Sequence, residues 1–214
     1  MSNFEYIISS LPYLTTGFKY EEGRRFSTVV EEIRENLGEK DSEALDFLLK
    51  GLDADNLNPD FYAQALAHPV RFLREYFSFD LNLRNAKVSY LNRQLGRPAD
   101  MDIISGKGGE EDENLDIDLY RFRPLEFEEE QKVENALAEI DLLSREKALD
   151  DICWEKIGRL ETFHYFDLTA VLAYVAKLSI VNRWLALDEN RGRQLFKQLV
   201  DEVRGTFKGV NYQA

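Results

Sequence analysis

The stretch FHYFDLTAVLAYVAKLSIVNRWLALDENRGRQLFKQLVDEV, residues Phe163–Val203, decides the fold. Its first part carries apolar side chains over most of a helical circumference, which is typical of a helix buried inside a bundle. These positions are Leu168, Val171, Leu172, Val175, Leu178, Ile180, Val181 and Leu185, with Tyr174 and Trp184 adding bulk. Asn182 and Arg183 interrupt this apolar surface together near its C-terminal end, so they are the residues that need an explanation.

The composition narrows the class of protein. The 214 residues include 40 acidic and 27 basic side chains, which gives a net charge of −13. This balance argues against binding of nucleic acid and against adhesion to an anionic membrane, because both require positive charge. A single cysteine, Cys153, leaves no partner for an intrachain disulfide and is typical of a reducing compartment. The first residues lack the features of a secretory signal, and polar residues interrupt the apolar run Leu168–Leu187, so we expect a cytoplasmic protein without direct membrane insertion.

The first half of the chain has helical spacing of apolar residues after a short opening segment, Asn3–Leu14, which fits either a strand or an extended arm. Gly38 is expected to follow the first helix as its C-terminal cap. Pro69 is expected to divide the third helix near His68. The predicted helices run from near Arg24 to Leu37, from Ser42 to Leu52, from Asn58 to Phe77 and from Leu81 to Leu95.

Helical spacing resumes near Glu126, with acidic residues in the first turn, where the helix dipole favours them. The apolar residues that follow have heptad-like spacing, which predicts one shared helix face. They are Val133, Leu137, Ile140 and Leu143. A further helix is expected over Ala148–Thr162. The complete pattern predicts an all-α helical bundle.

Residues 100–124 separate two parts of similar length, 1–99 and 125–214. Gly106-Lys107-Gly108-Gly109 and four consecutive acidic residues predict a surface loop there. Phe77–Asn85 can be aligned with Tyr174–Asn182 without a gap, and each asparagine has an arginine beside it, Arg84 or Arg183. Either chance similarity between leucine-rich helices or a duplication explains this match. A duplication predicts two similar helical units within one compact domain, an architecture that usually presents binding surfaces.

Two segments resemble motifs that bind nucleotides or calcium, but neither segment matches its motif. A phosphate-binding loop needs Ser or Thr where Gly108 stands. The Asp53 loop begins like an EF-hand, but Leu57 and Asn58 occupy positions that need an oxygen ligand and a glycine. Turn formation and helix capping explain the Asp53 loop better. We therefore expect no cofactor and no metal site.

His68 and His164 are the only histidines, and neither has a second metal ligand at suitable spacing. Each is expected to be packed or to lie at a helix end, and Cys153 to be a buried thiol. No catalytic residue is assigned. A helical enzyme remains an alternative, and it would require a deep pocket with converging polar groups that include His164 or His68.

The paired asparagines and arginines have two interpretations. They stabilise the bundle through hydrogen bonds and ion pairs with neighbouring carboxylates, or they mark a seam between helical units or a contact with a partner. The partner-binding candidates are Arg84, Asn85, Tyr174, Asn182 and Arg183.

These residues also carry a family resemblance. The segment from Leu168 through Tyr174 to Asn182-Arg183 resembles a helix in the C subunit of V/A-type rotary ATPases, which is subunit d of the eukaryotic enzyme. Asp80-Leu-Asn-Leu-Arg-Asn-Ala-Lys87 resembles a repeated Asp-x-x-Asn-Leu-(Arg/Lys) pattern of that family. The chain, including Tyr6–Leu14 and Gly51–Leu57, also resembles an uncharacterised bacterial family that tends to be encoded beside V-type ATPase subunits.

The resemblance implies an all-helical, non-catalytic accessory or central-stalk subunit. It would lie at the cytoplasmic face of the membrane, between the rotor shaft and the membrane ring of proteolipid subunits. The C subunit is a funnel of three similar units, whereas this chain has room for two. Ser179 and Ile180 stand near the place where family members often have Glu-x-Glu. The alternative function is a stand-alone helical adaptor that binds another protein through the acidic loop and exposed aromatic residues.

Overall fold

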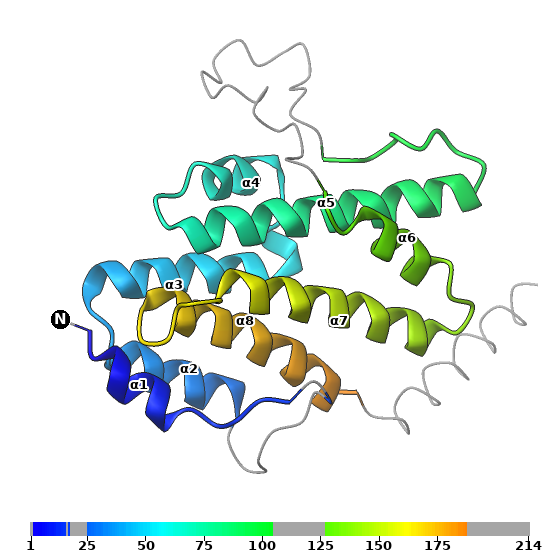
Figure 1. Cartoon of the computed structure of the whole chain (residues 1–214). Helices are drawn as coiled ribbons and strands as arrows, with labels where there is room; N and C mark the ends of the chain where they lie inside the picture. The colour runs from blue at the N-terminus through cyan, green and yellow to red at the C-terminus, as the bar shows by residue number, and fades with distance from the viewer. Residues whose placement is uncertain (1, 16, 18–24, 105–126, 188–214) are drawn as a thin grey trace, which may run out of the picture.

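The computed structural model describes residues 2–15, 17, 25–104 and 127–187. Within these ranges the chain forms eight α-helices and one short 3-10 helix and contains no strand, so the predicted all-α helical bundle is confirmed (Figure 1). The helices are α1 (Phe4–Ser10), α2 (Phe26–Glu35), α3 (Glu39–Leu52), α4 (Pro59–Leu66), α5 (Arg71–Gln94), α6 (Glu130–Leu137), α7 (Leu142–Leu160) and α8 (Leu168–Leu185), and the 3-10 helix η1 (Ala54–Asn56) lies between α3 and α4.

Helix α8 is the element around which the bundle is built. It contacts α1, α2, α3, α5 and α7, and Figure 1 shows it between the α1–α2 pair and α7. Each fully buried Leu or Val side chain contributes about 1.5–3 kcal/mol relative to an exposed one. The prediction of a buried helix in this stretch is therefore confirmed. Its buried residues are Val171, Leu172, Ala173, Val175, Ala176, Leu178, Ile180 and Val181.

Two apolar clusters form the core. The main core extends from Ile7 of α1 to Val181 of α8, so residues 1–99 and 125–214 both contribute to it. The smaller core lies between α5, α6 and α7. Its buried residues are Phe79, Leu83, Val133, Ala136, Leu137, Leu149 and Ile152. Cys153 packs against both clusters and thus marks the place where they meet.

Side-chain caps fix the starts of several helices. The Asn58 Oδ1 atom accepts a hydrogen bond from the backbone N–H of Phe61 at 2.9 Å, and Pro59 follows as the first helical residue of α4. Asp167 caps α8 in the same way through the N–H of Ala170 at 3.1 Å. The Asp53 carboxylate accepts the N–H of Asp55 at 3.1 Å, which is the turn chemistry expected for this loop.

The first half of the chain contains the predicted break at Pro69 and three boundaries that differ from the prediction. Helix α3 begins at Glu39, three residues before the predicted start at Ser42. Gly38 does not end a helix, because α2 ends at Glu35 and Gly38 is the N-cap of α3, with a φ of −75°. The predicted start at Leu81 lies inside α5, which runs unbroken from Arg71 to Gln94. Around Leu81 this helix passes from the main core to the smaller core, so its apolar positions change sides and imitate a boundary.

Two further expectations about helices are corrected. The predicted apolar face through Ile140 and Leu143 does not form, because α6 ends at Leu137 and Asp141 caps a new helix through the N–H of Ser144 at 2.7 Å. Ile140 is 97% exposed in the turn between these helices, and Leu143, in the first turn of α7, is 60% exposed. The opening segment is the helix α1 followed by extended residues, and not a strand.

Residues 97–104 return along the second half of α5. The Asn92 Nδ2 atom donates to the carbonyl oxygen of Met101 at 2.6 Å. Asn85 makes two hydrogen bonds with the backbone of Ile104, one at 2.8 Å and one at 2.9 Å. At the start of the next described range, the centroid of the Phe127 ring lies 6.2 Å from the centroid of the Phe79 ring. The predicted loop 100–124 lies outside the described residues beyond position 104.

One described helix, Leu168–Leu185, is long and apolar enough to cross a membrane by length and composition. A core helix of a bundle has the same properties, and the side chains of α8 pack against five other helices.

We predict that Gly51 tests the packing of α3 against α4 and α5. A Cβ atom at Gly51 would overlap the rings of Phe61 and Phe77, whereas a Cβ atom at Gly158 of α7 would meet nothing within 4 Å. Gly51→Ala should lower the free energy of unfolding by about 1–3 kcal/mol through overpacking. Gly158→Ala, the matched control, should raise it by about 0.5–1 kcal/mol. Urea unfolding measures both values, and equal effects would contradict the close approach at Gly51.

Candidate functional site

A hollow of about 490 Å³ between α3, α5, α7 and α8 brings together three of the residues singled out in the sequence, Arg84, Asn182 and Arg183. We call it the Asp–Arg hollow, because two aspartate–arginine pairs, Asp80–Arg84 and Asp150–Arg183, line it. It lies beside Cys153, where the two cores meet. The remaining lining residues are Phe26, Leu49, Gly51, Leu52, Asp53, Tyr76, Leu83, Lys87, Cys153, Ser179 and Ile180.

The Asp150–Arg183 pair joins α7 to α8. The Asp150 carboxylate is 5% exposed, and its Oδ1 atom accepts a hydrogen bond from the Arg183 Nη2 atom. Its Oδ2 atom accepts the indole N–H of Trp184 at 2.6 Å. A buried carboxylate is costly without partners, so these two donors explain how Asp150 is accommodated at this crossing.

The Asp80–Arg84 pair lies within α5, and Asp80 also bonds to α4. The Asp80 Oδ2 atom accepts the Arg84 Nε–H at 2.8 Å, one helical turn away on α5. It also accepts the hydroxyl hydrogen of Tyr62 at 2.6 Å. Burial, followed by the negative charge of Asp80, raises the pKa of Tyr62, so that hydroxyl remains a donor.

The Cys153 thiol also lines the hollow. Burial, together with the charges of Asp150 and Asp80, raises its pKa to about 12, although Lys87 and Arg183 act in the opposite direction. The thiolate is the nucleophilic form of cysteine. Cys153 is therefore protonated at neutral pH, as expected for a packed thiol.

Asn85 and Tyr174 lie away from the Asp–Arg hollow. Asn85 holds the returning segment through its bonds to Ile104. The Tyr174 hydroxyl donates to the carbonyl oxygen of Pro12 at 2.9 Å and fixes the extended residues after α1 against α8. Asn182 is exposed, and no side-chain partner is present within the described ranges. The two aligned asparagines thus have different surroundings.

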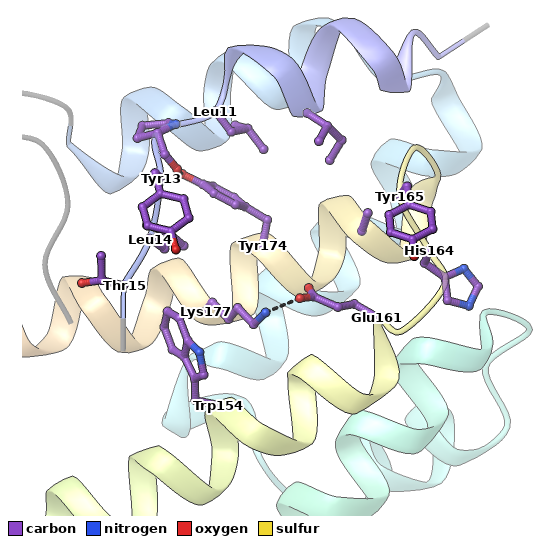
Figure 2. A pocket seen from close by; sticks show the side chains of 13 residues that line it. Leu11, Tyr13, Leu14, Thr15, Trp154, Glu161, His164, Tyr165, Tyr174 and Lys177 are labelled. Atoms are coloured by element: carbon purple, nitrogen blue, oxygen red, sulfur yellow. Dashed lines mark hydrogen bonds and ion pairs between the residues drawn. The ribbon is translucent and has the colours of Figure 1, made fainter. Parts of the chain in front are cut away.

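Tyr174 lines a second hollow, of about 600 Å³, between the N-terminal segment, α7 and α8. We call it the aromatic hollow after Tyr13, Trp154, Tyr165 and Tyr174. Figure 2 shows Tyr13 on the N-terminal side and Trp154 across from it on α7. Lys177 pairs with Glu161, and the Lys177 Nζ atom is 5.5 Å from the centroid of the Trp154 ring. This cation–π contact and ion pair hold α7 and α8 together at a second place.

The two histidines have the structural surroundings expected from the sequence. The His68 Nδ1 atom accepts the N–H of Val70 at 3.1 Å, and its ring packs 4.8 Å from that of Phe47. Burial and then the charge of Arg74 lower the pKa of His68. His164 lines the aromatic hollow at the turn before α8, where its Nδ1 atom is 2.5 Å from Asp167 Oδ2. Among the residues that can be described, no three His, Cys, Asp or Glu side chains are grouped to hold a metal ion.

Sequence reasoning missed Asp80, Asp150 and Lys87. A signal existed for Asp80, because it stands four residues before Arg84, which is the spacing of an ion pair along a helix. No such signal existed for Asp150, whose partners are 33 and 34 positions away on another helix. Lys87 follows Arg84 by three residues on α5, so it lines the same hollow.

We predict different roles for the neighbouring residues Asn182 and Arg183. Arg183→Ala leaves the buried Asp150 carboxylate with one of its two donors and should lower the free energy of unfolding by about 1–3 kcal/mol. Asn182→Ala, an exposed change one residue away, should alter it by no more than about 0.5 kcal/mol. Chemical denaturation of both variants measures the difference. A stable Arg183→Ala protein would show that the Asp150 pair does not support the fold.

We also predict slow alkylation of Cys153. At pH 8 its thiolate fraction is far below that of an unfolded cysteine, whose pKa is about 8.5, so iodoacetamide should react at least about tenfold more slowly than in the urea-unfolded chain. The raised pKa means that the folded state favours the protonated thiol, and this contribution to stability should be lost as the pH rises above about 8.5. Equal alkylation rates before and after unfolding would refute the assigned environment.

No curated protein and no solved structure matches this sequence. One family model does match, over residues 51–206, and its description is "Protein of unknown function (DUF2764)". The match includes α4 to α8 and every residue of the two aspartate–arginine pairs. The chain therefore belongs to the DUF2764 family.

Proposed function

We propose that this protein is a non-catalytic accessory or central-stalk subunit of a V/A-type rotary ATPase, located on the cytoplasmic side and linking the rotor shaft to the membrane ring. The proposal begins with the resemblance of Asp80–Lys87 and Leu168–Arg183 to the C subunit of these enzymes. The two segments are distant in sequence, and they lie on α5 and α8.

The observation that carries the proposal is the polar cross-linking of the bundle around these same two segments. Asp80 connects α5 to Tyr62 of α4, and Asp150 connects α7 to Arg183 of α8. These links add directional contacts to the apolar packing of the main core. A part that transmits torque needs a body that does not deform, and a bundle cross-linked in this way suits that role.

The net charge is consistent with the proposed partners. At −13, the chain would attract basic loops of a shaft or ring and increase the rate of encounter with them.

An adaptor function is the second candidate, and one turn of the structure favours it. Phe163, Tyr165 and Phe166 are 84%, 68% and 55% exposed between α7 and α8. Phe163 has a φ of 70°, in the left-handed region that a bulky side chain rarely adopts, and such strain is often found at functional positions. Exposed aromatic side chains are common anchors in protein interfaces.

Affinity purification of the tagged chain from native membranes tests the two functions. We expect the rotary ATPase subunits to co-purify with it. Their absence from the eluate, in cells shown to express the ATPase, would overturn the stalk proposal. As a matched variant we choose Phe163→Ser with Tyr165→Ser. If the protein is an adaptor, the original chain should recover a protein other than the ATPase subunits, and that protein is its partner. The variant should not recover this partner.

A further inference from the structure

The Asp–Arg hollow contains acidic groups whose hydrogen bonds are already made. Asp53 accepts from the N–H of Asp55 and from the Asn56 Nδ2 atom, at 3.1 and 3.2 Å. Asp80 and Asp150 likewise accept two hydrogen bonds each. All three carboxylates of the hollow are therefore engaged by groups of the protein itself.

The groups that remain uncommitted are donors. Lys87 is half-buried on α5, and neither an ion pair nor a hydrogen bond of its ammonium group is found in the described parts of the chain. The side-chain amide of Asn182 is equally unengaged there. Arg183 contacts Asp150 through one nitrogen, and its side chain is still 54% exposed, so its guanidinium has donors to spare.

These donors face one space. Lys87, Asn182 and Arg183 all line the hollow. Lys87 comes from α5, and Asn182 and Arg183 come from the last turns of α8. An anion in the hollow would thus meet donors from both α5 and α8.

About half of the wall of the hollow is apolar. Phe26, Leu49 and Leu52 come from α2 and α3, and Leu83 and Ile180 from α5 and α8. A volume of about 490 Å³ is within the range of sites for small organic ligands, which combine apolar walls with a few placed polar groups. A multiply charged anion would be disfavoured here, because the Asp80 and Asp150 carboxylates are close by.

We propose that the Asp–Arg hollow binds a carboxylate carried on an apolar body, with Lys87, Asn182 and Arg183 as the donors to its oxygens. The carboxylate belongs to a free organic acid or to an acidic residue flanked by apolar side chains in a partner protein. The inference does not rest on the ATPase proposal, because it concerns the donors of this chain alone.

The test uses hexanoate as the probe, with hexanol and inorganic phosphate as comparison ligands, and follows the backbone amide signals of residues 84–87 and 180–183 by NMR. Hexanoate should shift these signals saturably, and hexanol and phosphate should bind much more weakly. Equal binding of hexanol would show an apolar cavity without a carboxylate site. Stronger binding of phosphate would contradict the apolar body.

Variants of Lys87 assign the site. Lys87→Gln should weaken hexanoate binding about tenfold, the loss typical of one charge-assisted hydrogen bond, and Lys87→Arg should retain it. Arg93→Gln is the matched control, because it removes an exposed positive charge from the same helix. Equal affinity of Lys87→Gln and Arg93→Gln would overturn the assignment. A synthetic peptide ending in Leu-Leu-Glu, compared with hexanoate, distinguishes the two sources: tighter binding of the peptide indicates a protein partner, and tighter binding of hexanoate a free acid.

Discussion

The burial of the Asp150 carboxylate is the constraint on which the arrangement of α7 and α8 depends. A carboxylate that is 5% exposed must have strong donors, and both of its donors come from the last turn of α8. This requirement sets the register of α8 against α7. Because α8 also contacts α1, α2, α3 and α5, the same register determines how the rest of the bundle packs. The polar contact covers little area, but it fixes the position of α8.

The same constraint explains why a hollow exists beside Cys153. The main core and the smaller core meet there, and apolar side chains alone would close the gap between them. Charged groups at the meeting point need room for their hydrogen bonds, and so the surface remains open. On the other side of α8, Tyr174 and Lys177 line the aromatic hollow. One helix thus has an apolar surface that holds the bundle and two polar edges that line different cavities.

The spacing of apolar residues predicted helices best where a helix packs against a single core. The buried helix α8, the break at Pro69 and the start of a helix at Asn58 all follow from local chemistry, and each is present. Periodicity was misleading at Leu81, because α5 contacts two cores, and at Ile140, because an apolar residue in a turn is indistinguishable from one on a helix face. Of the candidate site, Arg84, Asn182 and Arg183 do meet, whereas Asn85 and Tyr174 serve other contacts. The partnership of Asp150 with Arg183 could not be read from spacing, since it depends on how two helices cross.

The anchoring of residues 104 and 127 to α5 has a consequence for how the chain can vary. Ile104 is bound to Asn85 of α5, and Phe127 packs on Phe79 of the same helix. Phe79 precedes Asn85 by six residues. Six helical residues advance about 9 Å along the helix axis. Both ends of the intervening segment are therefore attached to neighbouring turns of α5. A connection of a few residues could bridge such a distance, and each doubling of its length adds only about 0.6 kcal/mol of closure entropy. The position between Ile104 and Phe127 is therefore one where segments of very different length can be accepted, and where a tag or a second domain could be inserted without rebuilding the bundle.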